Sequence, residues 1–188
     1  MVKLNKIYTR TGDDGSSGLV DGSRVSKAGL RLIVIGEVDE ANSSIGVAIA
    51  ALGEHQVIGE RLRLVQNELF DLGADLATPE GIAGALRITA GQVTRIEDGI
   101  DVMNADLAPL TSFILPGGSV AVAALHVTRA VVRRAERAAV ALAASERVNP
   151  HAVAYLNRLS DHLFVAARSV AATEGGDVLW QPGATRNS

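Results

Sequence analysis

Apolar side chains recur at helical spacing along most of this sequence, and this periodicity restricts the possible folds more than any other feature. Within residues 56–77, one helix face is formed by Leu62, Val65, Leu69, Leu72 and Leu76. Thr89, as an N-cap, and Pro150, in a first turn, mark the starts of two further helices. With these, the predicted helices cover residues 36–52, 56–77, 90–102, 119–144 and 150–172. No repeat or composition break divides them, so we predict a single all-α domain, a five-helix bundle.

The first predicted helix opens at Gly36, after a short apolar run at residues 30–35. Its first turn would then contain Glu37, Asp39 and Glu40, whose negative charges favour the positive end of the helix dipole. A second interpretation of Asp39 stays open, in which its carboxylate is the partner of an Arg elsewhere in the bundle.

Composition and charge exclude several classes of protein. The net charge is −3 and the pI is near 5.8, whereas nucleic-acid-binding domains usually carry a basic surface. The chain has no Cys, and its four His lack the spacing of zinc ligands, so we predict no metal site made by its side chains. No apolar run reaches the roughly 18 residues of a membrane span. We therefore expect a cytoplasmic protein that binds neither nucleic acid nor membranes.

The fourth predicted helix carries an unusual basic stripe. Arg129, Arg133 and Arg137 stand four residues apart on one face, and Arg134 lies beside them. Like charges at this spacing cost an isolated helix roughly 0.2–0.5 kcal/mol per pair. The stripe is either a solvated basic face or a binding site for a polyanion. Because all four cations are Arg, whose planar guanidinium groups suit phosphate oxygens, the composition favours a phosphate site.

The segment between Thr9 and Gly18 is rich in Gly, Thr, Ser and Asp. Three Gly within seven residues are not expected to continue a helix or a strand. Such a loop can point its backbone N–H groups into one concavity, where Arg10 and Lys27 add positive charge for phosphate oxygens. A plain surface turn is the other interpretation, since neither of the common glycine patterns of nucleotide-binding loops occurs here.

Two other residues have both a structural and a functional interpretation. Phe113 precedes a Pro-Gly-Gly turn, so it either fills the core or lies at the mouth of a pocket. Asn157, on the last predicted helix, either makes a buried hydrogen bond between helices or belongs to a binding site.

Five segments, taken together, resemble the PduO-type corrinoid adenosyltransferases. In chain order they read YTRTGDDG from residue 8, GEVDE from 36, FILPGG from 113, RRAER from 133 and YLNRLSD from 155. Each is short, but their order and spacing cover the chain from about residue 6 to 172. The resemblance implies a five-helix bundle of the cobalamin adenosyltransferase type that assembles as a homotrimer, with active sites between neighbouring subunits.

The resemblance also implies roles for individual residues. The ATP phosphates would be held by a polar N-terminal phosphate-binding loop comprising Thr9, Arg10, Thr11, Gly12, Ser17, Gly18 and Lys27. From the adjoining subunit, the nucleotide would be contacted by Arg133, Arg137 and Asn157, with Arg134, Ala135 and Glu136 in the same motif. Asp39 would pair with Arg133 across the interface, and Phe113 would press on the lower face of the corrin. Mg²⁺ would accompany ATP, and cobalamin would be the substrate.

The implied reaction transfers the 5′-deoxyadenosyl group of ATP to cob(I)alamin, giving adenosylcobalamin and triphosphate. It requires cations for the departing charge and no general base or covalent nucleophile, which agrees with this sequence. A flavin-type reductase and a B12-dependent mutase would be its partners. A carrier that binds cobalamin and nucleotide without reaction is the alternative. In this organisation, residues 1–30 form the ATP-binding loop, residues 36–172 the bundle and residues 173–188 a flexible tail.

Overall fold

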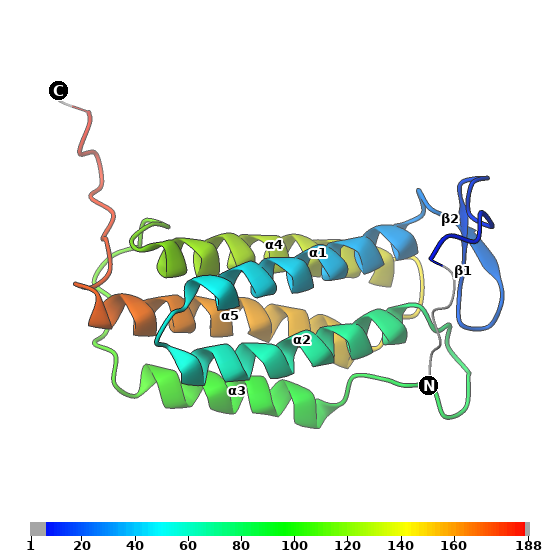
Figure 1. The fold of residues 1–188 in the computed structure, drawn as a ribbon, viewed down its shortest axis with the longest axis horizontal. Helices are drawn as coiled ribbons and strands as arrows, with labels where there is room; N and C mark the ends of the chain where they lie inside the picture. The colour runs from blue at the N-terminus through cyan, green and yellow to red at the C-terminus, as the bar shows by residue number, and fades with distance from the viewer. Residues whose placement is uncertain (1–6, 187–188) are drawn as a thin grey trace.

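The computed structural model describes residues 7–186 of the chain, and predictions for residues 1–6 and 187–188, at the ends of the loop and the tail, lie outside this range. Five helices form an elongated bundle with a small two-stranded sheet at one end (Figure 1). In chain order the elements are β1 (Ser16–Gly18), β2 (Arg24–Ser26), α1 (Leu30–Ala51), α2 (Gln56–Leu76), α3 (Ala90–Asn104), α4 (Val120–Ala143) and α5 (Pro150–Thr173). The five-helix bundle predicted from the periodicity is confirmed.

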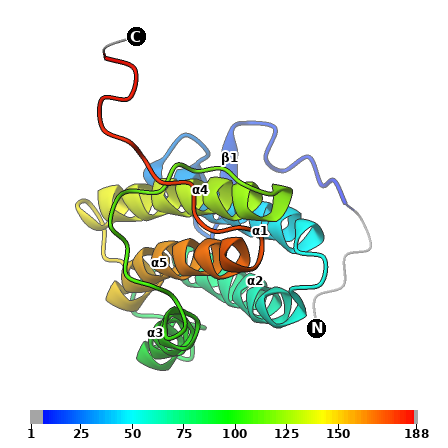
Figure 2. The same ribbon diagram turned by 90° about the vertical axis from the view of Figure 1, so that its left-hand side faces the viewer.

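Each helix packs mainly against one or two of the others. α4 packs against both α1 and α5, α2 lies against α1, and α3 lies against α5 (Figure 2). Small core residues allow these helices to approach closely, and the hydroxyl of Thr128 on α4 donates to the backbone oxygen of Ser44 on α1 at 3.0 Å. The Ala residues of the core are Ala41, Ala48, Ala121, Ala135, Ala139, Ala152, Ala166, Ala167 and Ala171.

Two predicted helix starts are confirmed in detail. Thr89 caps α3 in a reciprocal capping box, because its hydroxyl accepts from the backbone of Gln92 and the Gln92 side chain accepts from the backbone of Thr89. Pro150 occupies the first turn of α5 after the N-cap Asn149. The Asn149 amide also donates to Asp75 at 2.7 Å, which connects the start of α5 to the end of α2.

The predicted start of the first helix was wrong. α1 begins at Leu30 rather than at Gly36, because the apolar run at residues 30–35 continues the same buried face that includes Val34 and Val38. The first turn of α1 therefore contains no acidic residue. Glu37, Asp39 and Glu40 lie two turns further along, where the helix dipole no longer explains them.

The expectation that the N-terminal loop contains no strand was also wrong. β1 and β2 form an antiparallel pair in which Ser16 is opposite Ser26 and Gly18 is opposite Arg24. Each strand has only three residues, so one Gly at the end of β1 does not prevent pairing. The turn between the strands is joined to the bundle, since the N–H of Val20 donates to the backbone oxygen of Ala77 at 3.1 Å.

Part of the predicted tail has defined contacts. Beyond α5, Ile114 and Leu179 form an isolated antiparallel bridge, and the N–H of Trp180 donates to the backbone oxygen of Phe113 at 2.7 Å. The side chains of Arg168 and Asp177 form an ion pair at 3.0 Å, which holds the start of this segment on α5. Within residues 7–186, no helix is long and apolar enough to span a membrane.

Candidate nucleotide and corrin site

An open pocket of about 330 Å³ lies between α4 and α5. Two of the predicted Arg residues lie on its wall, together with the predicted Asn of α5. Its lining residues are Arg133, Glu136, Arg137, Val140 and Asn157. The helical spacing places Arg133, Glu136, Arg137 and Val140 on one face of α4, because residues three and four apart are neighbours there.

The hydrogen bonds of this pocket orient its polar groups. The Asn157 amide donates to the Glu136 carboxylate at 2.7 Å, while Arg158 donates to the Asn157 oxygen at 2.5 Å. Arg137 donates to the backbone oxygen of Arg133 at 3.0 Å. Within the described part of the chain, neither Arg133 nor Arg137 pairs with a carboxylate, so both guanidinium groups can accept an anionic ligand.

Arg134 faces the other way. Its guanidinium group joins α4 to α1 by ion pairs with Glu37, at 2.5 Å, and with Glu40. Hydrogen bonds to Glu40 and Glu37 raise the pKa of Arg134 above its ordinary value. Neither Arg134 nor the fully buried Ala135 lines the pocket, although both belong to the motif that predicted it.

Asp39 is exposed on α1 and makes no hydrogen bond or ion pair with any residue of the range 7–186. The acidic residues near it in the sequence, Glu37 and Glu40, form ion pairs with Arg134. Asp39 and Arg133 are thus both exposed and do not contact one another within one chain. The pairing of Asp39 with Arg133 between two copies of the chain stays a prediction.

The N-terminal hairpin brings together most of the predicted phosphate loop. The Lys27 ammonium group donates to the backbone oxygen of Gly12 at 2.8 Å, and the hydroxyls of Thr9 and Thr11 share a hydrogen bond of 2.9 Å. A Cβ atom at Gly12 would lie 2.9 Å from Lys27 Nζ, so any larger residue at this position would force the ammonium group to shift. Arg10 has a positive φ of 63°, which is unusual for a residue other than Gly.

Sequence reasoning did not assign a role to Arg24, although the structure places it at the centre of this hairpin. Its guanidinium group donates to the backbone oxygen of Thr11 at 2.5 Å and to the Ser16 hydroxyl at 2.8 Å. Asp14 accepts from both the hydroxyl and the backbone of Ser16, and these hydrogen bonds lower the pKa of its carboxyl. The sequence offered no local signal for this role, because β1 carries no charged residue and the contact depends on the strand register.

A second group lies one and two turns before Arg133 on α4; sequence reasoning named its Arg129 in the basic stripe but gave no role to its His126. His126 is buried, and neither of its ring nitrogens has a hydrogen-bond partner among the described residues. The Arg129 guanidinium lies over the ring of Phe164, 5.8 Å from its centroid, and its buried Nε is also unpaired. Burial, and secondly the charge of Arg133, lower the pKa of Arg129.

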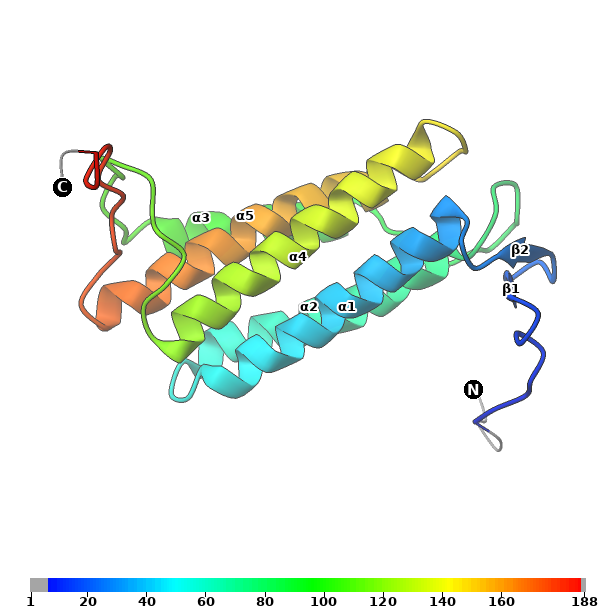
Figure 3. The ribbon, with the colours of Figure 1, turned by 90° about the horizontal axis from the view of Figure 1, so that it is seen from above.

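Phe113 is 78% exposed and does not fill the core. It lies with the β-bridge to the C-terminal segment at the end of the bundle where α4 begins, whereas the hairpin lies at the opposite end (Figure 1, Figure 3). α1, with 22 residues, spans ~33 Å between these ends. A single chain therefore does not bring its phosphate loop and its Phe113 together.

These features define a class of protein: an all-α bundle with an Arg-lined pocket on one pair of helices and a glycine-containing hairpin at one end. The profile of the family described as cobalamin adenosyltransferase matches residues 7–170. The chain belongs to this family.

Individual relatives agree with this assignment. The corrinoid adenosyltransferase of Mycobacterium bovis is 50% identical over 192 residues, covering 100% of this chain and 98% of the relative. The cobalamin adenosyltransferase of Cupriavidus metallidurans is 48% identical over 180 residues, covering 95% and 96% of the two chains. The predicted family and enzyme class are confirmed.

Among solved structures, the fold is similar to that of a variant PduO-type ATP:corrinoid adenosyltransferase from Lactobacillus reuteri complexed with cobalamin and ATP. The TM-score is 0.89 at 36% sequence identity, with 94% of this chain and 97% of that chain covered. The predicted fold class is confirmed.

Proposed function

We propose that this protein transfers the 5′-deoxyadenosyl group of ATP to cob(I)alamin, giving adenosylcobalamin and triphosphate. The observation that carries the proposal is the pocket between α4 and α5, in which Arg133 and Arg137 have no carboxylate partner among residues 7–186 and Asn157 is held in place by Glu136. Free guanidinium groups beside an oriented amide suit a triphosphate and its nucleoside.

In the proposed reaction, the electron pair of cobalt(I) attacks C5′ of ATP. The cobalt pair forms the new cobalt–carbon bond, and triphosphate leaves with the electron pair of the C5′–O bond, so cobalt is formally oxidised from I to III. The role of the protein would be to neutralise the charge on the departing triphosphate, through Arg133 and Arg137 of the pocket and Lys27 of the hairpin. No proton is transferred, so the site needs no general base.

The phosphate loop and the Arg pocket would complete one site by joining neighbouring subunits of a homotrimer. Two observations support this part of the proposal. The hairpin and the Phe113 segment lie at opposite ends of one chain, and Asp39 is exposed without a partner among the described residues. In addition, α1 and α4 expose large apolar side chains, as surfaces that associate commonly do. These side chains are Ile33, Val47, Val120, Val127 and Val140.

Phe113 would act on the cobalt rather than on the nucleotide. Its exposed ring can occupy the lower face of the corrin and displace the axial ligand there, leaving a four-coordinate cobalt(II) that is easier to reduce. A flavin-type reductase would supply the electron, and a B12-dependent mutase would receive the product. Because the chain would need no such aromatic residue to carry the cofactor passively, the exposure of Phe113 favours the enzyme over a carrier.

Mg²⁺ would enter with the ATP phosphates, whose charge it would partly neutralise and whose geometry it would hold. The residues present fit this form of binding. In the described range 7–186, no three His, Asp or Glu side chains gather to hold a metal ion. Mg²⁺ commonly keeps several water ligands and binds through nucleotide phosphates, so the residues of the hairpin would hold it by way of the phosphates.

An anaerobic assay with the full-length protein, cob(I)alamin and MgATP tests the proposal. We expect the visible band of cobalt(I) to disappear as a light-sensitive alkylcobalamin and free triphosphate form in equal amounts. Binding of both ligands without any spectral change would instead indicate the carrier. Failure to bind either ligand would overturn both.

A further inference from the structure

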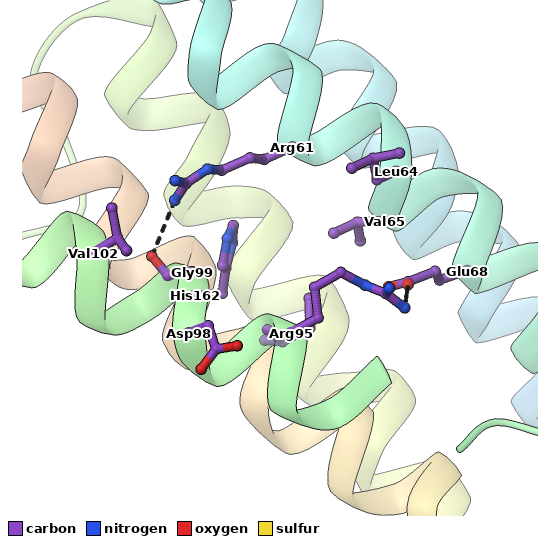
Figure 4. A pocket seen from close by; sticks show the side chains of 10 residues that line it. Arg61, Leu64, Val65, Glu68, Arg95, Asp98, Gly99, Val102 and His162 are labelled. Atoms are coloured by element: carbon purple, nitrogen blue, oxygen red, sulfur yellow. Dashed lines mark hydrogen bonds and ion pairs between the residues drawn. The ribbon is translucent and has the colours of Figure 1, made fainter. Parts of the chain in front are cut away.

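A separate pocket of about 270 Å³ lies between α2 and α3 (Figure 4). α3 packs on α5 and α2 packs on α1, so these two helices leave a groove between them in which α5 contributes the floor. None of the residues that line this pocket belongs to the hairpin, to the Arg133 pocket or to the Phe113 loop.

His162 of α5 lies in this groove, and its burial is not explained by the packing alone. The residue is only 2% exposed, and its Nδ1 has no hydrogen-bond partner within residues 7–186. The edge of the ring carrying Nε2 lies against Gly99 of α3, where a Cβ would be 3.1 Å from Nε2. Buried polar atoms without a partner are uncommon in folded proteins, so the imidazole belongs to a polar site rather than to the apolar core.

Of the two Arg residues that line the pocket, Arg61 has no carboxylate partner among the described residues. Arg61 donates only a long bond of 3.3 Å to the backbone oxygen of Gly99, and no carboxylate of the described chain lies within ion-pair distance of it. Arg95 is neutralised by Glu68 at 2.5 Å, and the Tyr155 hydroxyl donates to the same carboxylate at 2.8 Å. Figure 4 shows Arg61 and Arg95 on opposite sides of the pocket, with His162 between them.

The remaining walls are apolar. Leu64 of α2 and Val102 of α3 line the pocket while 60% and 58% exposed, and Val65 and Ile96 lie deeper. Asp98 is exposed at the rim on α3. A doubly charged anion such as phosphate would be repelled by Asp98 more strongly than a singly charged one, and would leave the apolar walls uncovered.

We propose that this pocket binds a small carboxylate with a short aliphatic chain. The carboxylate accepts hydrogen bonds from the Arg61 guanidinium, and the chain covers Leu64 and Val102 above the imidazole of His162. The pocket shares no residue with the hairpin, the Arg133 pocket or the Phe113 loop, so the ligand is distinct from the substrates of adenosyl transfer. The inference does not rest on the proposed reaction, because its residues lie on other faces of the bundle.

The test uses butyrate as the probe and the ring resonances of His162, in full-length protein labelled with ¹⁵N-histidine, as the readout. We expect a saturable shift of these resonances with butyrate and none with butyramide, which has the same shape without the charge. Arg61→Gln should weaken butyrate binding by about tenfold or more, because it removes a charge-assisted hydrogen bond.

Two matched variants sharpen the test. Arg63→Gln changes an exposed Arg on the same helix outside the pocket and should leave the affinity unchanged. Asp98→Asn should strengthen binding, because it removes a like charge. The proposal is overturned if folded wild-type protein shows no saturable shift, if butyramide or inorganic phosphate binds as well as butyrate, or if Arg61→Gln and Arg63→Gln behave alike.

Discussion

The ring of Phe113 packs against the ring of Trp180, with the two centroids 6.0 Å apart and the ring planes inclined by 58°. Backbone hydrogen bonds hold the pair together, because Trp180 donates its N–H to Phe113 and its backbone oxygen accepts from the Ser112 hydroxyl at 2.7 Å. Phe113 remains 78% exposed and Trp180 44% exposed. The C-terminal segment thus supports one side of the Phe113 ring and leaves the other side open to a ligand.

The first prediction concerns this aromatic pair. Phe113→Ala should still bind ATP with unchanged affinity but should react at least about tenfold more slowly from cobalt(II), a barrier increase of about 1.4 kcal/mol. Trp180→Ala should also keep the ATP affinity and lower the rate from cobalt(II), but by a smaller factor, because Phe113 is kept and loses only the ring that packs against it. Rates measured from cobalt(II) and from chemically reduced cobalt(I) separate this role from general damage. An equal loss of ATP binding would mean that Phe113 is only a packing residue.

The second prediction concerns the Arg pocket. Arg133→Ala should reduce turnover by about tenfold to a hundredfold, because a hydrogen bond between charged groups contributes about 1.5–3 kcal/mol. Arg133→Lys should recover only part of this, since a single ammonium group cannot form two parallel bonds. Arg63→Ala, on the exposed surface of α2, is the matched control and should keep full activity. Steady-state kinetics with near-normal turnover in Arg133→Ala would remove this residue from the mechanism.

A third prediction follows from the carboxylate of Asp39, which has no partner within residues 7–186. If the proposed trimer forms, Asp39→Arg should weaken it by placing two cations together, and adding Arg133→Asp should restore it, because the charges are then exchanged. Sedimentation velocity measures both effects. Arg129 is the informative comparison, since its Nε is buried without a partner within the described chain. Restoration by Arg129→Asp but not by Arg133→Asp would show that the predicted partner of Asp39 is the wrong Arg.

The fourth prediction concerns the contact between Gly12 and Lys27. Gly12→Ala should push the Lys27 ammonium group away from the backbone oxygen that holds it, and should weaken ATP binding several-fold, as Lys27→Ala should. Gly73→Ala in α2, where an added Cβ has open space, should leave ATP binding unchanged and stabilise the helix by about 0.5–1 kcal/mol. Calorimetric titration with MgATP measures the affinity of the hairpin variants and of the Gly73→Ala control. Unchanged binding in both hairpin variants would place the phosphates elsewhere.

A fifth prediction concerns stability and pH. Burial, with a smaller contribution from the charge of Arg61, lowers the pKa of His162 to about 4. In the unfolded chain this pKa is about 6.5, so between these values the unfolded state binds more protons than the folded state. Stability should therefore fall as the pH is lowered from 6.5 to 4, by on the order of 3 kcal/mol.

Urea unfolding at several pH values tests this dependence. His162→Gln should be less stable at neutral pH but should lose less stability between pH 6.5 and 4 than the wild type. The same slope in both proteins would assign the acid sensitivity to other groups. His151 lies on the exposed part of α5, and His151→Gln therefore serves as the control.

The sequence by itself determined the elements of this protein and much of the candidate site. Apolar rows, the Thr89 cap and Pro150 depend on contacts within a few residues, and these predicted four helices closely. The spacing of Arg133 and Arg137 likewise placed both on one face of α4 with no knowledge of the fold. The start of α1 was missed because the run at residues 30–35 is too short to distinguish a strand from a helix until its buried face is seen.

Only the tertiary structure decided which partner each polar group has. Arg134 follows Arg133 directly in the chain, yet it faces α1 and is neutralised there, because neighbouring residues on a helix point about 100° apart. The pairing of Phe113 with Trp180, and the groove around His162, join segments distant in the sequence. Local sequence patterns do not contain such contacts, because the contacts depend on how whole helices pack. This packing also decides which Arg has a carboxylate partner and which does not.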